Sequence, residues 1–270
     1  MKPQVKIIIN PNDGLNGELA MALAAARRLR PVAGLLVLAF LLLCSSPSSW
    51  AQLYREQNPK ATIGGTEVWL AGPPDFPRID GLDRHLDDIL LAAQSPAAAV
   101  LAIYAEPEAW KKFRDGLKDK AGLDCHAVIS TPAPLAEGHI SPDDFAGIKK
   151  DLATGLQAAI GRDRALDEAL AGVSDHHLEK ATSRLESFEI LADEPDFITY
   201  RLGNLLELKF KDQSASSLNR STAVISTLLL NGKILNLQLD SNLPDQTELD
   251  KTGRLWRESF LKANLRNSEH

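Results

Sequence analysis

Cysteine is scarce in this sequence. Of the 270 residues only Cys44 and Cys125 are cysteines, and Cys44 lies in a segment that we expect to be removed. Cys125 is then left alone, so no internal disulfide is expected. A domain of about 220 residues can do without one, because it is long enough to bury a large core.

Short catalytic and ligand-binding motifs are also missing. The sequence contains no HExxH, no GxSxG, no Walker A loop, no CxxC pair and no GxGxxG after a predicted strand. We therefore predict no catalytic residue, no metal ligand, no cofactor-binding residue and no cofactor. The absence of these motifs favours a protein without enzymatic activity over an enzyme.

An apolar run near the N-terminus is too short to be an ordinary membrane span. Val32 to Cys44 is 13 residues long, whereas a spanning helix needs about 20. Three arginines, Arg27, Arg28 and Arg30, precede the run, and a small, polar stretch ending in Ser49-Trp50-Ala51 follows it. A basic flank, a short apolar core and a small-residue exit are typical of a Sec signal peptide.

The signal divides the chain into four predicted segments. They are a mis-assigned leader (1–20), a signal peptide cleaved after Ala51 (21–51), a flexible polar tether (52–64) and a single domain (65–266). Such a signal predicts a periplasmic protein. An uncleaved signal that holds the protein at the inner membrane is the alternative, and only then is a membrane partner expected.

Acidic residues outnumber basic ones. The chain has 30 Lys and Arg against 36 Asp and Glu, and removing the five basic and two acidic residues of 1–51 leaves a net charge of −9. Nucleic acid and anionic membranes are recognised through basic patches. We expect neither as a partner, which leaves an unknown protein or small molecule of the cell envelope.

The spacing of apolar residues predicts a mixed α+β fold, an antiparallel sheet flanked by helices. Predicted strands are 66–71, 98–104, 125–131, 188–190, 206–210, 221–230 and 235–239. Predicted helices are 82–94, 107–113, a long one that starts after Ser141 and ends at Gly161, another from Leu166 reaching as far as Leu185, and 245–265.

Three local sequence features predict details of the sheet. Asn231-Gly232 between two strand-like runs predicts a hairpin, because both turn residues must take positive φ. The strand at 221–230 is apolar on both faces and is predicted to be central. Strands at 188–190, 206–210 and 235–239 alternate apolar with polar residues, so part of the sheet is expected to be covered on one side only.

Two stretches resemble a known group of proteins. One runs from Ile63-Gly64-Gly65-Thr66 to Pro73-Pro74-Asp75-Phe76, and then through Val100-Leu101-Ala102-Ile103-Tyr104. The other runs from Ser221-Thr222-Ala223-Val224 across Asn231-Gly232-Lys233 to Trp256 and Ala263-Asn264. Both are similar to exported bacterial proteins of unassigned function with a PsbP-like α/β/α sandwich. The resemblance implies that fold and, by analogy of fold, a binding or accessory role.

Two clusters that contain histidine are candidates for a metal site or for a catalytic pair. In Asp175-His176-His177 the adjacent histidines diverge by about 100° on a helix, which is a poor metal geometry, so a solvated helix end is favoured. In Asp124-Cys125-His126 the histidine suggests a base for a thiol nucleophile. On a strand the two side chains point to opposite faces, and Cys125 is then a buried small hydrophobe.

The acidic cluster and the tryptophans can also be explained by structural roles. Asp83 and Asp87 share one helical face, with Asp88 beside them, and paired acids can serve acid–base chemistry or bind a cation. We interpret them as a solvated face, because Arg84 lies four residues before Asp88. Trp69, Trp110 and Trp256 can stack on a ligand, but Trp256 is in phase with Leu249 and Phe260 and is predicted to be core. Trp110 is the least explained.

These features favour a non-enzymatic periplasmic accessory or binding module. The first alternative is an exported hydrolase whose site is assembled from distant residues, with His126 or His139 involved. The second is an inner-membrane-anchored envelope protein that acts through a partner.

Overall fold

The computed structural model describes residues 59–83, 86–87, 90–91, 94, 97–115, 123–165, 178–210, 217–242 and 245–265. Within them the fold is mixed α+β, as predicted, with a seven-stranded sheet and a separate two-stranded one. The predicted leader and signal peptide lie outside the described residues, as does Asp175-His176-His177. None of the described helices is long and apolar enough to cross a membrane.

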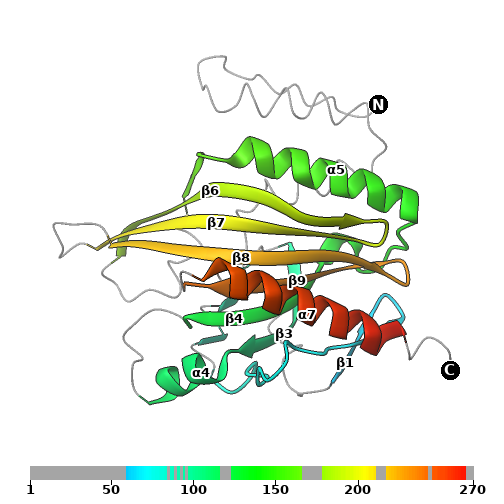
Figure 1. The fold of residues 1–270 in the computed structure, drawn as a ribbon, viewed down its shortest axis with the longest axis horizontal. Helices are drawn as coiled ribbons and strands as arrows, with labels where there is room; N and C mark the ends of the chain where they lie inside the picture. The colour runs from blue at the N-terminus through cyan, green and yellow to red at the C-terminus, as the bar shows by residue number, and fades with distance from the viewer. Residues whose placement is uncertain are drawn as a thin grey trace, which may run out of the picture.

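The large sheet is entirely antiparallel, and its strand order is β3-β4-β9-β8-β7-β6-β5 (Figure 1). Its strands are β3 (Ala98–Ala105), β4 (Cys125–Pro132), β5 (Asp163–Ala165), β6 (Leu178–Glu194), β7 (Phe197–Phe210), β8 (Ser217–Leu230) and β9 (Lys233–Ser241). Strands β5 to β9 form a meander, and β4 and β3 extend the sheet from β9. Strand β8 is therefore the middle strand, as its two apolar faces predicted.

The remaining elements flank this sheet. They are the small-sheet strands β1 (Lys60–Ile63) and β2 (Thr66–Trp69), the helices α4 (Pro107–Arg114), α5 (Pro142–Ala159) and α7 (Gln246–Leu265), and the 3-10 helix η2 (Ala133–Leu135). Helix α5 begins as predicted, because Ser141 Oγ accepts a hydrogen bond from the backbone N of Asp144 at 3.1 Å and Pro142 occupies the first turn.

The β8–β9 hairpin turns at Asn231-Gly232, which confirms the prediction. The two residues have φ of 50° and 76°, and Leu230 pairs with Lys233 directly across the turn. Two consecutive positive φ angles are what a type I′ turn requires, and they match the twist of the strands.

Helix α7 lies across β8 and β9 on one face of the sheet, where it appears red in Figure 1. Trp256 is 1% exposed and packs in one cluster with Leu249, Phe260 and the β9 leucines, so its predicted core position is confirmed. The indole Nε1 also donates to Ala71 O at 2.8 Å. Gly253 permits this close approach, since a Cβ there would lie 2.8 Å from Val224 Cγ1.

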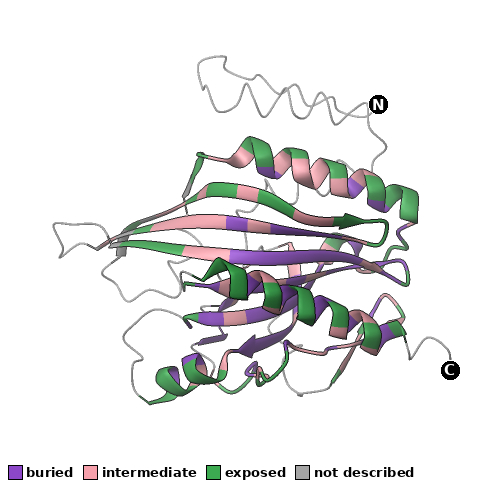
Figure 2. Cartoon of the chain, viewed as in Figure 1, coloured by how far each residue is buried: buried purple, intermediate pink, exposed green. Residues whose placement is uncertain are grey.

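The opposite face of the sheet is covered by three separate groups of residues. In one of them Phe145 and Ile148 of α5 pack with Ile234 of β9. Leu152 and Leu156 of α5 pack with Tyr200 and other residues of β7 and β8. Phe113 of α4 packs with Val128 and its neighbours on β3 and β4. Figure 2 shows buried residues in the middle of β7 and β8 and exposed or intermediate ones at their left-hand ends, so the sheet is not covered along its full length.

Two predictions of secondary structure are wrong. The predicted tether ends in strand β1, which pairs with β2 and places Ile63 in the core at 3% exposure. The helix extending to Leu185 is also wrong at its end, because β6 begins at Leu178 and pairs with β7 along its length. Pairing in the sheet outweighs the weak helical preference of this stretch.

Candidate functional site

Cys125 and His126 point to opposite faces of β4, as the strand reading predicted. Cys125 is 7% exposed and lies in the cluster under α7. Burial raises the pKa of its thiol to about 12, and the carboxylate of Glu106 adds to the shift. A thiolate is the reactive form, so this cysteine is held in its unreactive state.

The other residues considered from the sequence have structural partners. Asp83 Oδ1 accepts from Leu86 N at 3.1 Å. Asp87 is only 9% exposed, which corrects its reading as part of a solvated face. Its Oδ2 accepts from Gly81 N at 2.9 Å, so the carboxylate closes the preceding turn. Asp88 lies outside the described residues.

The tryptophans and His139 also lie against neighbouring groups. Trp110 stacks on Phe113 with ring centroids 5.7 Å apart. The Trp69 ring lies under the ammonium of Lys60, 4.5 Å from the centroid. His139 is exposed and its imidazole lies over the β8–β9 turn.

Polar side chains instead gather on the sheet face away from α7, along β9. The odd-numbered leucines of β9 pack with α7, and successive side chains of a strand alternate between faces. The even-numbered polar residues therefore face the other way, between the parts of the sheet that α4 and α5 cover. We call the β9 polar strip the set of Asn236, Gln238 and Asp240 of β9, with their polar cross-strand neighbours His126 and Ser130 of β4 and Thr227 of β8. The two cross-strand partners of Gln238, Val128 and Ile225, are apolar and buried.

His126 and Asp240 form the most chemically capable pair of the strip. They are direct partners in the β4–β9 register, with His126 Nε2 3.5 Å from Asp240 Oδ2 and side chains 15% and 17% exposed. Gln238 Nε2 donates to the same Oδ2 at 2.8 Å. Burial raises the pKa of Asp240, and His126 and Gln238 oppose that shift.

The His126 ring has a second nitrogen that is not used. Its Nδ1 is buried and has no hydrogen-bond partner among the residues described. Burying an unpaired polar atom costs about 1–3 kcal/mol. Because this nitrogen is buried, a ligand atom reaches it only if the groups that cover it move.

The other end of the strip is a hydrogen-bonded chain. Thr227 Oγ1 donates to Asn236 Oδ1 at 2.9 Å, and Thr227 also bonds the hydroxyl of Tyr200. Burial raises the pKa of Tyr200 to about 12, so this hydroxyl stays protonated. These bonds fix the Asn236 carboxamide with its oxygen occupied and its nitrogen directed elsewhere.

Sequence reasoning did not find this site because its two reactive groups are 114 positions apart, at 126 and 240. The alternation of Asn236, Gln238 and Asp240 was visible, but it is typical of a solvent-facing strand surface. Only the pairing of β4 with β9 brings His126 beside Asp240.

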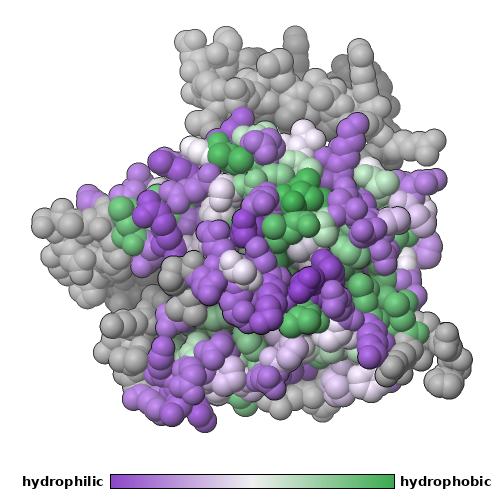
Figure 3. Space-filling model, in the orientation of Figure 1, coloured by the Kyte–Doolittle hydropathy of each residue, from purple (hydrophilic) through white to green (hydrophobic). Residues whose placement is uncertain are grey.

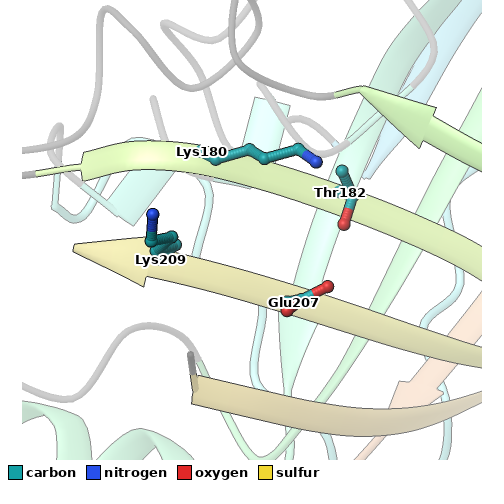
Figure 4. Close-up of a pocket in the computed structure, with 4 residues that line it drawn as sticks. All are labelled: Lys180, Thr182, Glu207 and Lys209. Atoms are coloured by element: carbon teal, nitrogen blue, oxygen red, sulfur yellow. The ribbon is translucent and has the colours of Figure 1, made fainter. Parts of the chain in front are cut away.

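A hollow of about 210 Å³ lies at the far end of the β6–β7 hairpin (Figure 4). Lys180 and Thr182 of β6 and Glu207 and Lys209 of β7 line it, and the two lysines are direct partners across the strands. Lys180 and Glu207 are exposed, so water screens their charges strongly. Charges in such a setting select ligands weakly, and the β9 polar strip is the better-defined site.

The face that carries α7 also holds polar contacts: Arg201 pairs with Glu189 and with Asp250 of α7, and the buried Arg257 of α7 donates to Thr199 Oγ1 at 2.7 Å. In Figure 3 hydrophilic and hydrophobic residues are interspersed on this face, and hydrophobic ones gather over β6 and β7 between α5 and α7. The exposed large hydrophobic side chains of the described residues are Leu82, Ile190, Leu218, Leu255 and Leu265.

Within the described ranges no group of three or more His, Cys, Asp or Glu residues is arranged to hold a metal ion. Comparison of the chain with protein-family models and with curated proteins finds no match.

Proposed function

We propose that this protein is an exported, periplasmic accessory or binding module with a PsbP-like sandwich fold, and that the β9 polar strip is its binding surface. The observation that carries the proposal is the concentration of half-buried polar groups on one strand, between two regions that helices cover. Polar groups inside a sandwich are ordinarily replaced by apolar ones, as they are on the α7 side of β9.

The orientation of the strip residues supports binding rather than packing. Gln238 donates a hydrogen bond to Asp240, which fixes the orientation of both side chains. Both side chains remain partly exposed. Fixed, partly exposed polar groups lose little conformational entropy when a ligand binds. The raised pKa of the Cys125 thiol and its position on the other face argue against a Cys–His nucleophile.

Export is proposed from the basic, apolar and small-residue segments at 27–51. Fractionation of the native host, with N-terminal sequencing of the recovered protein, tests it. A periplasmic protein that begins at Gln52 is the expected result. Membrane-bound protein that retains Arg30 would instead support the anchored alternative, and cytoplasmic protein would refute export.

Binding at the strip is tested in the same cells with a photo-crosslinking amino acid at Gln238. A matched probe at Gln157, which is exposed on α5, serves as the control. We expect an adduct of defined mass at Gln238 and none at Gln157. Equal labelling at both positions, or none at either, would refute the strip as a binding surface.

The second candidate is a hydrolase in which His126 acts as general base and Asp240 orients it. The 3.5 Å contact between His126 Nε2 and Asp240 Oδ2, with His126 Nδ1 unbonded among the described residues, is the observation that favours it. Chromogenic esters, phosphates and glycosides test this function. Turnover that His126→Gln abolishes, while His139→Gln leaves it intact, would establish it; no turnover with any of these substrates counts against it.

A further inference from the structure

We propose that the β9 polar strip binds a neutral, polyhydroxylated ligand of the saccharide class. This inference rests on the proposed binding role and names its ligand. Asn236, Gln238 and Asp240 supply a row of planar amide and carboxyl groups, and His126 supplies a ring nitrogen beside the last of them.

The row has the length of an extended ligand. Alternate residues of an antiparallel strand are about 6.8 Å apart, so the strip runs for about 14 Å from Asn236 to Asp240. Each polar side chain is followed by another at the same spacing on the same face. A linear ligand with hydroxyl groups at regular intervals can contact all three, whereas a compact ion can contact only one.

The strip offers both donor and acceptor groups. Asn236 has its oxygen occupied by Thr227, which leaves its NH₂ to donate. Gln238 has its nitrogen occupied by Asp240, which leaves its carbonyl oxygen to accept. A hydroxyl group donates one hydrogen bond and accepts others, so vicinal hydroxyls complement such a row.

His126 adds a group that needs a partner. Its Nδ1 is buried and unbonded within the described part of the chain. A ligand hydroxyl that displaces the groups covering this nitrogen satisfies it in either tautomer, because a hydroxyl can donate to a bare nitrogen or accept from a protonated one.

Charge excludes anionic ligands from this site. The six residues of the strip include no lysine or arginine, and Asp240 would repel an anion whenever it is ionised. Anion sites use arginine, lysine or helix N-termini. The lysines of the described hollow, Lys180 and Lys209, lie instead at the far end of the β6–β7 hairpin. A neutral ligand with many hydroxyls fits the strip best.

Calorimetric titration of the full, processed protein with maltose, cellobiose and chitobiose tests the proposal, with inorganic phosphate as the anionic probe. We expect saturable binding of at least one saccharide and none of phosphate. Gln238→Leu and Asn236→Leu should each weaken saccharide binding at least tenfold. Gln246→Leu, at an exposed position that begins α7, should leave it unchanged.

A second measurement separates binding from mere folding effects. The imidazole nitrogen shifts of His126, assigned by comparison with His126→Gln, should move when saccharide is added and stay fixed with phosphate. Variants that melt within a few degrees of wild type are compared, and Asp240→Asn replaces any leucine variant that fails to fold. Saccharide binding that survives both strip variants, or leaves the His126 shifts unchanged, overturns the proposal.

The experiments distinguish a wrong ligand class from a wrong binding role. If the Gln238 crosslink captures a protein or a lipid and no saccharide binds, the ligand class is wrong and the binding role remains. If Gln238 and Gln157 crosslink equally, the binding role itself is wrong. Tight phosphate binding at the strip would overturn the neutral-ligand argument alone.

Discussion

Replacing Trp256 with alanine tests the packing of α7 on the sheet. The indole is 1% exposed and contacts residues of β2, β8 and β9 within one cluster. Truncation of a large buried aromatic side chain costs about 3–5 kcal/mol. Loss of the hydrogen bond from Nε1 to Ala71 O adds about 1 kcal/mol, because the part-buried carbonyl loses that partner.

This loss is large against a typical stability of about 5–15 kcal/mol. In a domain of this size each kcal/mol lowers Tm by about 2–4 °C, so the packing loss alone should lower Tm by about 6–20 °C. Trp256→Phe keeps much of the apolar contact and loses the hydrogen bond, so its cost should be intermediate. Urea unfolding followed by circular dichroism measures all three proteins on one scale.

The matched control is Leu255→Ala, on the adjacent position of α7. Leu255 is 43% exposed, and substitutions at such surface positions usually change stability by about 0.5 kcal/mol or less. If Trp256→Ala costs no more than Leu255→Ala, the indole is not in the core. The placement of α7 over β8 and β9 would then be wrong.

Three further predictions concern other elements. Gly232→Ala should destabilise more than Gly65→Ala in urea unfolding. Both have positive φ of about 76–77°, but only at Gly232 would a Cβ meet His139, 2.1 Å from its Nδ1, so that the exposed imidazole must swing away; equal losses would contradict this steric argument. Cys125 should react with a thiol reagent only after denaturation, because burial raises its pKa to about 12; rapid labelling of native protein, with Cys44 absent after processing, would restore a nucleophile role. Burial raises the pKa of Asp240 above its unfolded value, so the native state binds more protons and stability should fall as pH rises from about 4 towards 7. Asp240→Asn should show a smaller fall when unfolding free energies are measured at both pH values, and an unchanged fall would contradict the buried carboxyl.

Local patterns determined the elements that depend on neighbouring residues. The Asn231-Gly232 turn follows from the backbone freedom of those two residues, both of which have positive φ. The start of α5 follows from Ser141 and Pro142, which satisfy or remove unpaired backbone donors. The central position of β8 follows from its two apolar faces, which water would penalise at any sheet edge.

Long-range pairing decided what the sequence could not. Strand β1 looked like a polar tether, because its stability comes from hydrogen bonds to β2 and from the burial of Ile63 rather than from its own composition. The candidate site also depends on long-range pairing. His126 and Asp240 become neighbours only because β9 returns beside β4, and the closure of a loop of that length depends on the whole core. The sequence determined which side chains are polar and the periods at which they recur, whereas the tertiary structure decided which of them meet.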